Sequence, residues 1–80
     1  MTAVDFELRG NHITLDALLK ATGQVASGGG AKGLIAAGEV LVNGQTEIRR
    51  GRKVRAGDVV SLRDHRINVL EPAQGAAADA

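Results

Sequence analysis

The feature that most constrains this chain is the set of residues from which its core can be built. Its 80 residues include one Phe and no Trp, Tyr or Cys. A chain of this length buries only about 60 % of its unfolded surface, and without Cys it has neither a disulfide framework nor a thiolate metal site. The core must therefore be small and assembled from Val, Leu, Ile and Ala, without a deep substrate cavity.

The N-terminal part of the sequence predicts a strand followed by a short helix. Apolar and charged residues alternate over residues 4–9, which is the pattern of a strand with one buried face. A helix is expected next, because Thr14 can act as its N-cap and Asp16 places a negative charge in its first turn. Ile13 precedes the cap as a hydrophobic staple. Gly23 is placed to end this helix in a left-handed turn.

A second helix is predicted over residues 27–37, with Ser27 as its N-cap and Gly38 as its stop. It contains several glycines, each of which costs about 1 kcal/mol relative to Ala in a helix interior. Tertiary packing, or the close approach of another molecule to its backbone, must compensate. The N–H groups at its start, beside Lys32, suit one phosphate group. The alternative is a helix terminus capped by Ser27 and water alone.

The same segment, residues 28–33, formally satisfies the dinucleotide-binding pattern G-x-G-x-x-G, with Glu47 near the position of a ribose-binding acid. That pattern requires a strand directly before it in a βαβ unit, whereas a helix is predicted there. We therefore reject a dinucleotide site and expect no cofactor.

The remainder of the sequence predicts short strands joined by turns. Asn43 and Gly44 both tolerate the positive φ of a type I′ hairpin turn. Gly57 and Asp58 form a second turn, and residues 64–65 form a third. The predicted strands are residues 40–42, 45–48, 59–63 and 66–70.

The chain is expected to form one domain over residues 1–71, followed by a disordered tail over residues 72–80, which are Ala-rich and lack periodicity. The N-terminus lacks the basic and apolar regions of a signal peptide, and no stretch approaches the roughly 20 apolar residues of a membrane span. We expect a cytoplasmic monomer that has no membrane partner.

Charge is sorted along the chain, although the net charge is only +1. Residues 1–48 and 67–80 each carry −2, whereas residues 49–66 carry +5. Like charges packed together repel one another unless an anionic partner is present, and local basic patches are typical of nucleic-acid-binding surfaces. The alternative is a solvated loop that keeps the protein soluble. Five of the cations lie within seven positions: Arg49, Arg50, Arg52, Lys53 and Arg55.

The sequence contains no catalytic or metal-binding constellation. His12 and His65 lack the spacing of metal ligands, and Ser27 has no nucleophile elbow. We expect a protein that is not an enzyme and binds no metal. Phe6, the one aromatic residue, lies on the predicted core face, so RNA contacts would depend on phosphates, 2′-hydroxyl groups and shape rather than on stacked bases.

The order of these elements resembles a known family over about residues 13–70. The matching features are the helix at 15–20, the second helix at 27–37, the sequence GEVLVNG at 38–44 and the GDVV turn at 57–60. They resemble the S-four RNA-binding domain, whose αL motif is named after ribosomal small-subunit protein four. Residues 27–32 together with 49–53 are similar to its small stand-alone bacterial subgroup, the YbcJ/YaaA-like proteins. Gly28 stands where the wider family usually has arginine, which removes one expected phosphate contact.

The resemblance implies an α+β fold in which two short helices pack on a small antiparallel sheet. It also implies a non-catalytic protein that binds structured RNA, such as ribosomal RNA or its precursor, with the ribosome or its assembly intermediates as partners. The RNA surface would lie between the start of the second helix and the basic run. The predicted RNA-binding residues are Ser27, Gly28, Gly29, Gly30, Lys32, Arg49, Arg50, Arg52, Lys53 and Arg55. The alternative function is a protein-interaction adaptor whose basic loop docks on an acidic partner.

Overall fold

A computed structural model describes residues 2–72 of the chain. The predicted tail lies outside the described residues from position 73 onward. The elements, in chain order, are β1 (Thr2–Glu7), β2 (Ile13–Thr14), α1 (Leu15–Ala21), α2 (Gly28–Ala36), β3 (Val40–Val42), β4 (Gln45–Thr46), β5 (Lys53–Val54), β6 (Val59–Leu62) and β7 (His65–Leu70).

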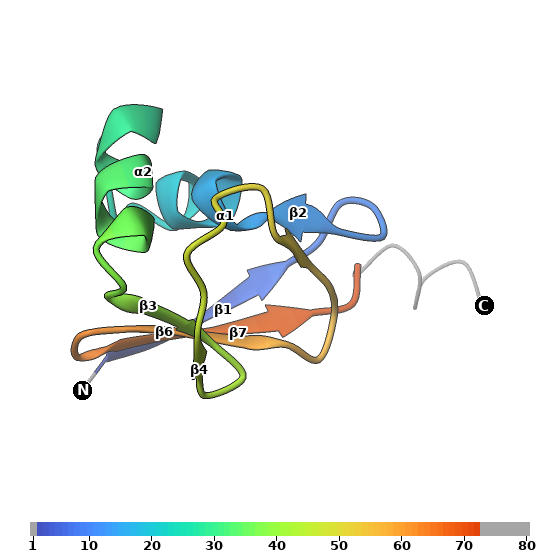
Figure 1. The fold of residues 1–80 in the computed structure, drawn as a ribbon. Coiled ribbons are helices and arrows are strands. Elements are labelled where there is room, and N and C mark those ends of the chain that lie inside the picture. The colour runs from blue at the N-terminus through green and yellow to red at the C-terminus, as the bar shows by residue number, and fades with distance from the viewer. Residues whose placement is uncertain (1, 73–80) are drawn as a thin grey trace, which may run out of the picture.

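Two helices lie on one face of a five-stranded sheet whose strand order is β1-β7-β6-β3-β4, and β2 and β5 pair as a separate two-stranded ribbon (Figure 1). This arrangement confirms the predicted α+β fold class. One strand direction differs from the expected antiparallel sheet, because β1 pairs with β7 in parallel. A hairpin would require antiparallel pairing, but β1 leads into β2 and the helices, and so long a connection allows β1 to return alongside β7 in parallel.

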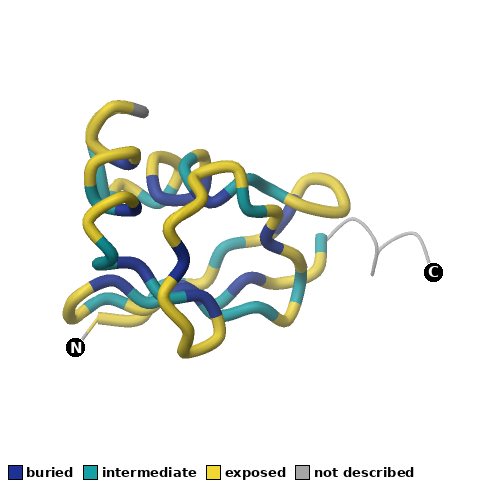
Figure 2. The backbone as a smooth tube through the Cα atoms, in the orientation of Figure 1, coloured by how far each residue is buried: buried dark blue, intermediate teal, exposed yellow. Residues whose placement is uncertain are grey.

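The core lies between the helices and the sheet, where the buried segments gather in Figure 2. It is aliphatic, as the composition requires, and Phe6 is only partly buried at its margin. The side chains alternate along the strands, so that every second residue of β3, β6 and β7 points into the core. The buried hydrophobic residues are Leu8, Leu15, Leu18, Leu19, Ala31, Ile35, Val40, Val42, Val54, Val60, Leu62, Ile67 and Val69.

Glycines end both helices, as predicted. Gly23 has φ +77° and Gly38 has φ +79°, which are left-handed conformations that other residues rarely adopt. After α1, the N–H groups of Gly23 and Gln24 donate to the carbonyls of Lys20 and Leu19, at 3.1 and 2.9 Å. This double hydrogen bond is a Schellman motif, and the same pattern follows α2.

The first hairpin turn is confirmed, and the last one lies one residue earlier than predicted. Asn43 (φ +53°) and Gly44 (φ +82°) form the turn between β3 and β4. The β6–β7 turn consists of Arg63 and Asp64, since Leu62 pairs with His65. Burial fixes this register, because a shift by one residue would turn the core residues of one strand toward solvent.

Two predicted strands also have different bounds in the structure. The strand expected over residues 4–9 is Thr2–Glu7, and the one expected over residues 45–48 is shortened to Gln45–Thr46. The chain leaves the sheet at Glu47, whose side chain turns toward the arginines that follow it. The segment beyond β4 is therefore a loop, and its geometry decides how the basic residues are presented.

Candidate nucleic-acid interface

The basic loop, residues 47–52, connects β4 to β5 on the helix side of the sheet (Figure 1). Its crest is a tight turn in which the Arg52 N–H donates to the Arg49 carbonyl at 3.2 Å. Arg50 and Gly51 occupy the corner of this turn. Lys53 follows directly in β5, where it pairs with Thr14 of β2.

The basic loop is fastened to the start of α1 by its backbone. The Leu15 N–H donates to the Arg52 carbonyl at 2.9 Å, and the Asp16 N–H donates to the Arg50 carbonyl at 3.1 Å. The first N–H groups of a helix have no partner within the helix, so the loop satisfies them. Thr14 occupies the predicted N-cap position, but its side chain makes no cap hydrogen bond because the loop carbonyls take that role.

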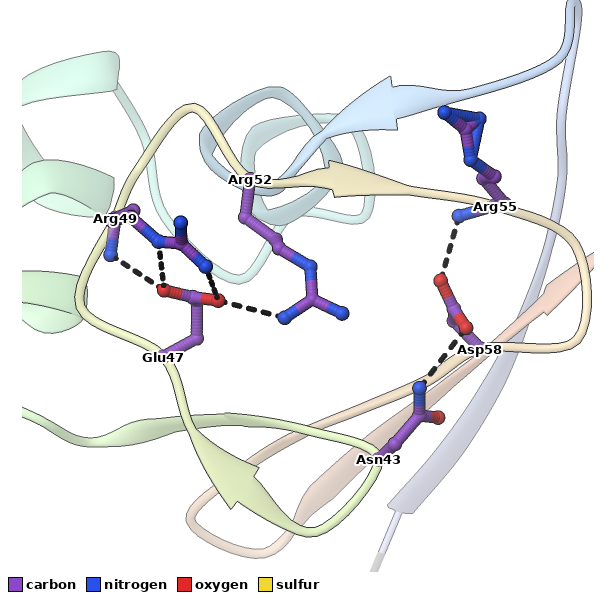
Figure 3. Close-up of polar contacts among 6 residues, drawn as sticks. All are labelled: Asn43, Glu47, Arg49, Arg52, Arg55 and Asp58. Atoms are coloured by element: carbon purple, nitrogen blue, oxygen red, sulfur yellow. Dashed lines mark hydrogen bonds and ion pairs between the residues drawn. The ribbon is translucent and has the colours of Figure 1, made fainter.

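Glu47 is the first residue of the basic loop, its side chain is only 7 % exposed, and it binds two arginines of the same loop (Figure 3). Its Oε2 accepts hydrogen bonds from the backbone N–H and the Nε–H of Arg49, both at 3.0 Å. Its Oε1 accepts from Nη2 of Arg49 at 3.3 Å and from Nη1 of Arg52 at 2.7 Å. Both carboxylate oxygens are thus engaged by the loop's own donors.

These contacts change the acidity of the groups involved. Hydrogen bonds from the Arg49 side chain, then from Arg52 and the Arg49 backbone, lower the pKa of Glu47 from 4.5 to about 2. The hydrogen bond with Glu47 likewise raises the pKa of Arg49 above its ordinary value. Glu47 is therefore ionised throughout the physiological range, and it places a negative charge between the two guanidinium groups.

A second polar cluster fixes the segment that carries Arg55 (Figure 3). Asn43 donates from Nδ2 to Oδ1 of Asp58 at 3.0 Å and accepts the Val59 N–H at 2.9 Å. The Arg55 N–H donates to Oδ2 of Asp58 at 2.8 Å. Burial acts to raise the pKa of Asp58, but these hydrogen bonds and the charges of Arg52 and Arg55 lower it overall. The predicted turn residues Asn43 and Asp58 thus join the β3–β4 hairpin to the end of β5.

The cations of the basic run remain available to a ligand despite these contacts. The Arg49 side chain is 75 % exposed and that of Arg52 is 35 % exposed. Arg49, Gly51, Arg52 and Lys53 line an open depression on the surface. Arg50, Lys53 and Arg55 are exposed. The structure therefore brings three of the predicted cations, Arg49, Arg52 and Lys53, around one depression, and leaves Arg50 and Arg55 exposed outside its lining.

The start of α2 forms a separate part of the same side of the molecule. Ser27 caps α2 as predicted, accepting the Gly30 N–H at 3.3 Å. Among the described contacts, no hydrogen bond or ion pair joins residues 27–32 to the basic loop. Figure 1 shows that α2 begins at its end farther from the sheet and runs down toward β3. A ligand that contacts both Gly28–Gly30 or Lys32 and the basic loop would therefore have to span the distance between these two parts.

Glu47 is the residue whose role the sequence did not reveal. In the sequence it matches only a position of the dinucleotide-binding pattern, which does not apply here. The available signal is that it is the one acidic residue between positions 40 and 57, two residues before Arg49. Within residues 2–72 no helix is long and apolar enough to cross a membrane, and no group of three or more His, Asp or Glu side chains could hold a metal ion.

Comparison with known proteins identifies the fold. The chain is 48 % identical over 50 residues to the "Probable ribosome maturation protein RlbA" of Bacillus subtilis, covering 62 % of this chain and 70 % of that protein. It is 42 % identical over 59 residues to YbcJ of Escherichia coli, covering 74 % of this chain and 84 % of YbcJ. The solution structure of YbcJ, described as revealing an αL motif involved in RNA binding, matches with a TM-score of 0.63 and 37 % identity, over 88 % of this chain and 87 % of YbcJ.

The sequence profile of the S4 domain matches residues 6–70, which run from within β1 to the end of β7. The match therefore includes both helices, the basic loop and the Asn43–Asp58 cluster. The resemblance inferred from the sequence is confirmed: this chain belongs to the S4 domain family.

Proposed function

We propose that this protein binds structured RNA without catalysing a reaction, and that ribosomal RNA or its precursor is the target. The observation that carries the proposal is the basic loop, whose arginines are held in place by the start of α1 and by Glu47. Cations held in fixed positions suit the regularly spaced phosphates of a folded nucleic acid better than cations on a mobile loop would. The ribosome or an assembly intermediate is the proposed partner.

The relatives support this assignment from a separate direction. RlbA carries a name that refers to ribosome maturation, and the YbcJ structure is described in terms of RNA binding. The proposed contact residues are the exposed cations of the basic run and the start of α2. They are Ser27, Gly28, Gly29, Gly30, Lys32, Arg49, Arg50, Arg52, Lys53 and Arg55.

The chemistry of this surface favours contacts to the RNA backbone. Phe6 is partly buried beside the core, so no aromatic side chain is available in the basic loop for stacking on bases. Ile48 is 66 % exposed within the loop and adds apolar surface next to the cations. Recognition would then depend on phosphates, 2′-hydroxyl groups and the shape of the RNA. Non-specific binding of this kind has a Kd of roughly 10⁻⁴ to 10⁻⁶ M at physiological salt.

The proposal is tested by measuring binding to a structured RNA, a DNA duplex and a polyanion such as heparin over a series of salt concentrations. The test variant is Arg50→Ala/Lys53→Ala, because neither side chain contacts Glu47 in the structure. The matched control is Arg9→Ala/Arg66→Ala, which removes the same charge from exposed positions elsewhere. We expect structured RNA to bind best, and the test variant to reduce the slope of log K against log salt by about two.

Equal binding to all three polyanions, or equal losses in the test and control variants, would contradict RNA recognition by this surface. In that case the adaptor function becomes the better explanation. An adaptor would retain its protein partner after nuclease treatment, whereas an RNA-bridged complex would dissociate.

A further inference from the structure

The buried carboxylate of Glu47 is unusual because it places a negative charge among cations that would otherwise attract an anionic ligand. Its side chain is 7 % exposed, yet both of its oxygens face guanidinium groups of the basic loop. Burial of an ionised carboxylate is unfavourable unless it is paired and hydrogen-bonded. The four hydrogen bonds from Arg49 and Arg52 provide that compensation.

The hydrogen bonds to Glu47 leave most guanidinium donors free. A guanidinium group carries five N–H donors in a rigid plane. Arg49 donates from Nε and Nη2, so its Nη1 group is not used by Glu47. Arg52 donates only from Nη1, so the edge formed by Nε and Nη2 is not used, and this edge is one with which arginine binds a phosphate through two hydrogen bonds.

Arg49 and Arg52 line the open depression together with Gly51 and Lys53. A Cβ atom built on Gly51 would meet no heavy atom within 4 Å, so the space beside Gly51 is open. The backbone beneath is fixed, since the Arg50 and Arg52 carbonyls accept hydrogen bonds from the start of α1. The two arginine side chains are therefore held at their guanidinium ends by Glu47, and the loop backbone that carries them is held by α1.

We propose that Arg49 and Arg52 form a binding site for one phosphate group of the RNA. Glu47 is the positioning residue that holds their guanidinium groups in the orientation that binds this phosphate. This inference rests on the proposed function of the same surface. It differs from simple charge attraction, because a long arginine side chain must be ordered before it binds a phosphate through two hydrogen bonds. Glu47 performs that ordering in the free protein.

The alternative role of Glu47 predicts a result of opposite sign. If Glu47 merely occupies the place of the phosphate, or acts only through its charge, its neutralisation raises the positive charge of the loop and strengthens RNA binding. If Glu47 positions the arginines, neutralisation releases both side chains and weakens binding. Ordering one long side chain corresponds to roughly 2- to 12-fold in affinity, so release of two predicts a loss of about 5- to 150-fold.

The experiment compares Glu47→Gln with Glu7→Gln in binding to the structured RNA at a fixed salt concentration. Both changes remove one negative charge, but Glu7 is exposed on β1, outside the basic loop. Thermal unfolding establishes that each variant is folded at the temperature of the assay. We expect Glu47→Gln to bind at least about fivefold more weakly than the wild type, and Glu7→Gln to bind equally well or slightly better.

If Glu47→Gln does not fold, a second pair of variants tests the same proposal. Arg49→Lys keeps the charge of a side chain that is 75 % exposed, but a lysine cannot reproduce the planar contacts with Glu47 and a phosphate. Arg66→Lys is its control, because Arg66 is exposed on β7, outside the basic loop. We expect weaker binding with an unchanged salt slope for Arg49→Lys alone.

Tighter or unchanged binding by Glu47→Gln, or equal behaviour of the two lysine variants, would overturn the positioning role. That failure is distinct from failure of the proposed function. The proposed function fails when the wild-type protein itself does not prefer structured RNA to duplex DNA and heparin.

Discussion

Replacement of Gly33 by Ala should stabilise the protein, because nothing in the described structure requires a glycine there. Gly33 lies inside α2, and a Cβ atom built on it would meet no heavy atom within 4 Å. Glycine in a helix interior is less favourable than Ala by about 0.5–1 kcal/mol. A change of 1 kcal/mol shifts Tm by about 4–8 °C in a domain of this size. We therefore expect Tm to rise by about 2–8 °C in Gly33→Ala.

Circular dichroism at 222 nm during heating measures this shift. Gly38→Ala is the matched control, because Gly38 has φ +79° and Ala is strained in that conformation. The control should lower Tm, although both changes add the same methyl group. An unchanged or lower Tm in Gly33→Ala would refute the reasoning, since α2 would then not be a regular helix with an open surface at this position.

The same variant also tests whether RNA approaches the glycine-rich surface of α2. A methyl group at Gly33 should weaken RNA binding if a backbone phosphate contacts this side of the helix, even though the protein becomes more stable. Gly29→Ala serves as a second position, since its added Cβ would meet only Ser27 Oγ, at 3.8 Å. Unchanged affinity in both variants would confine the RNA surface to the basic loop and β5.

Three further results are expected. Leu18→Ala, at a fully buried position of α1, should lower the free energy of unfolding by about 2–5 kcal/mol in urea denaturation. Asn43→Ala should lower it by roughly 1–3 kcal/mol, because it loses two side-chain hydrogen bonds and places Ala at φ +53°, whereas Asn43→Gly should lose only the hydrogen-bond part. The folded-state pKa of Glu47, about 2, lies below its ordinary value of 4.5, so its contribution to stability is present above pH 4.5 and is lost as pH falls toward 2. Thermal melts across that range should therefore show a weaker acid dependence in Glu47→Gln than in the wild type.

Local features of this fold could be predicted from the sequence because they depend on the chemistry of single residues. Gly23 and Gly38 end the helices and Asn43 forms a turn, since few residues adopt positive φ. The aliphatic core follows from the alternation of apolar residues in the strands. The basic run follows from charge alone, and the structure places three of its members, Arg49, Arg52 and Lys53, around one depression. Their contacts with RNA stay predictions.

The features that were not predicted depend on segments far apart in the sequence. No local pattern tells whether β1 pairs with β7 in parallel, because that choice depends on the path of the whole intervening chain. Glu47 similarly reads as an ordinary acidic residue at the end of a strand. Its role emerges only when the loop folds back on α1 and brings Arg52 within 2.7 Å of its carboxylate.

The pairing of β1 with β7 has a consequence for the order of folding. Asp5 and Asn68 face each other across a separation of 63 residues, and their side chains are joined by a hydrogen bond at 3.1 Å. Closing so long a loop is entropically unfavourable, so β1 should dock last and detach first. β1 and β4 occupy opposite edges of the sheet, and the basic loop extends from β4. Transient opening of the protein should therefore begin at the edge farthest from β4, while the arginines of the loop keep their arrangement.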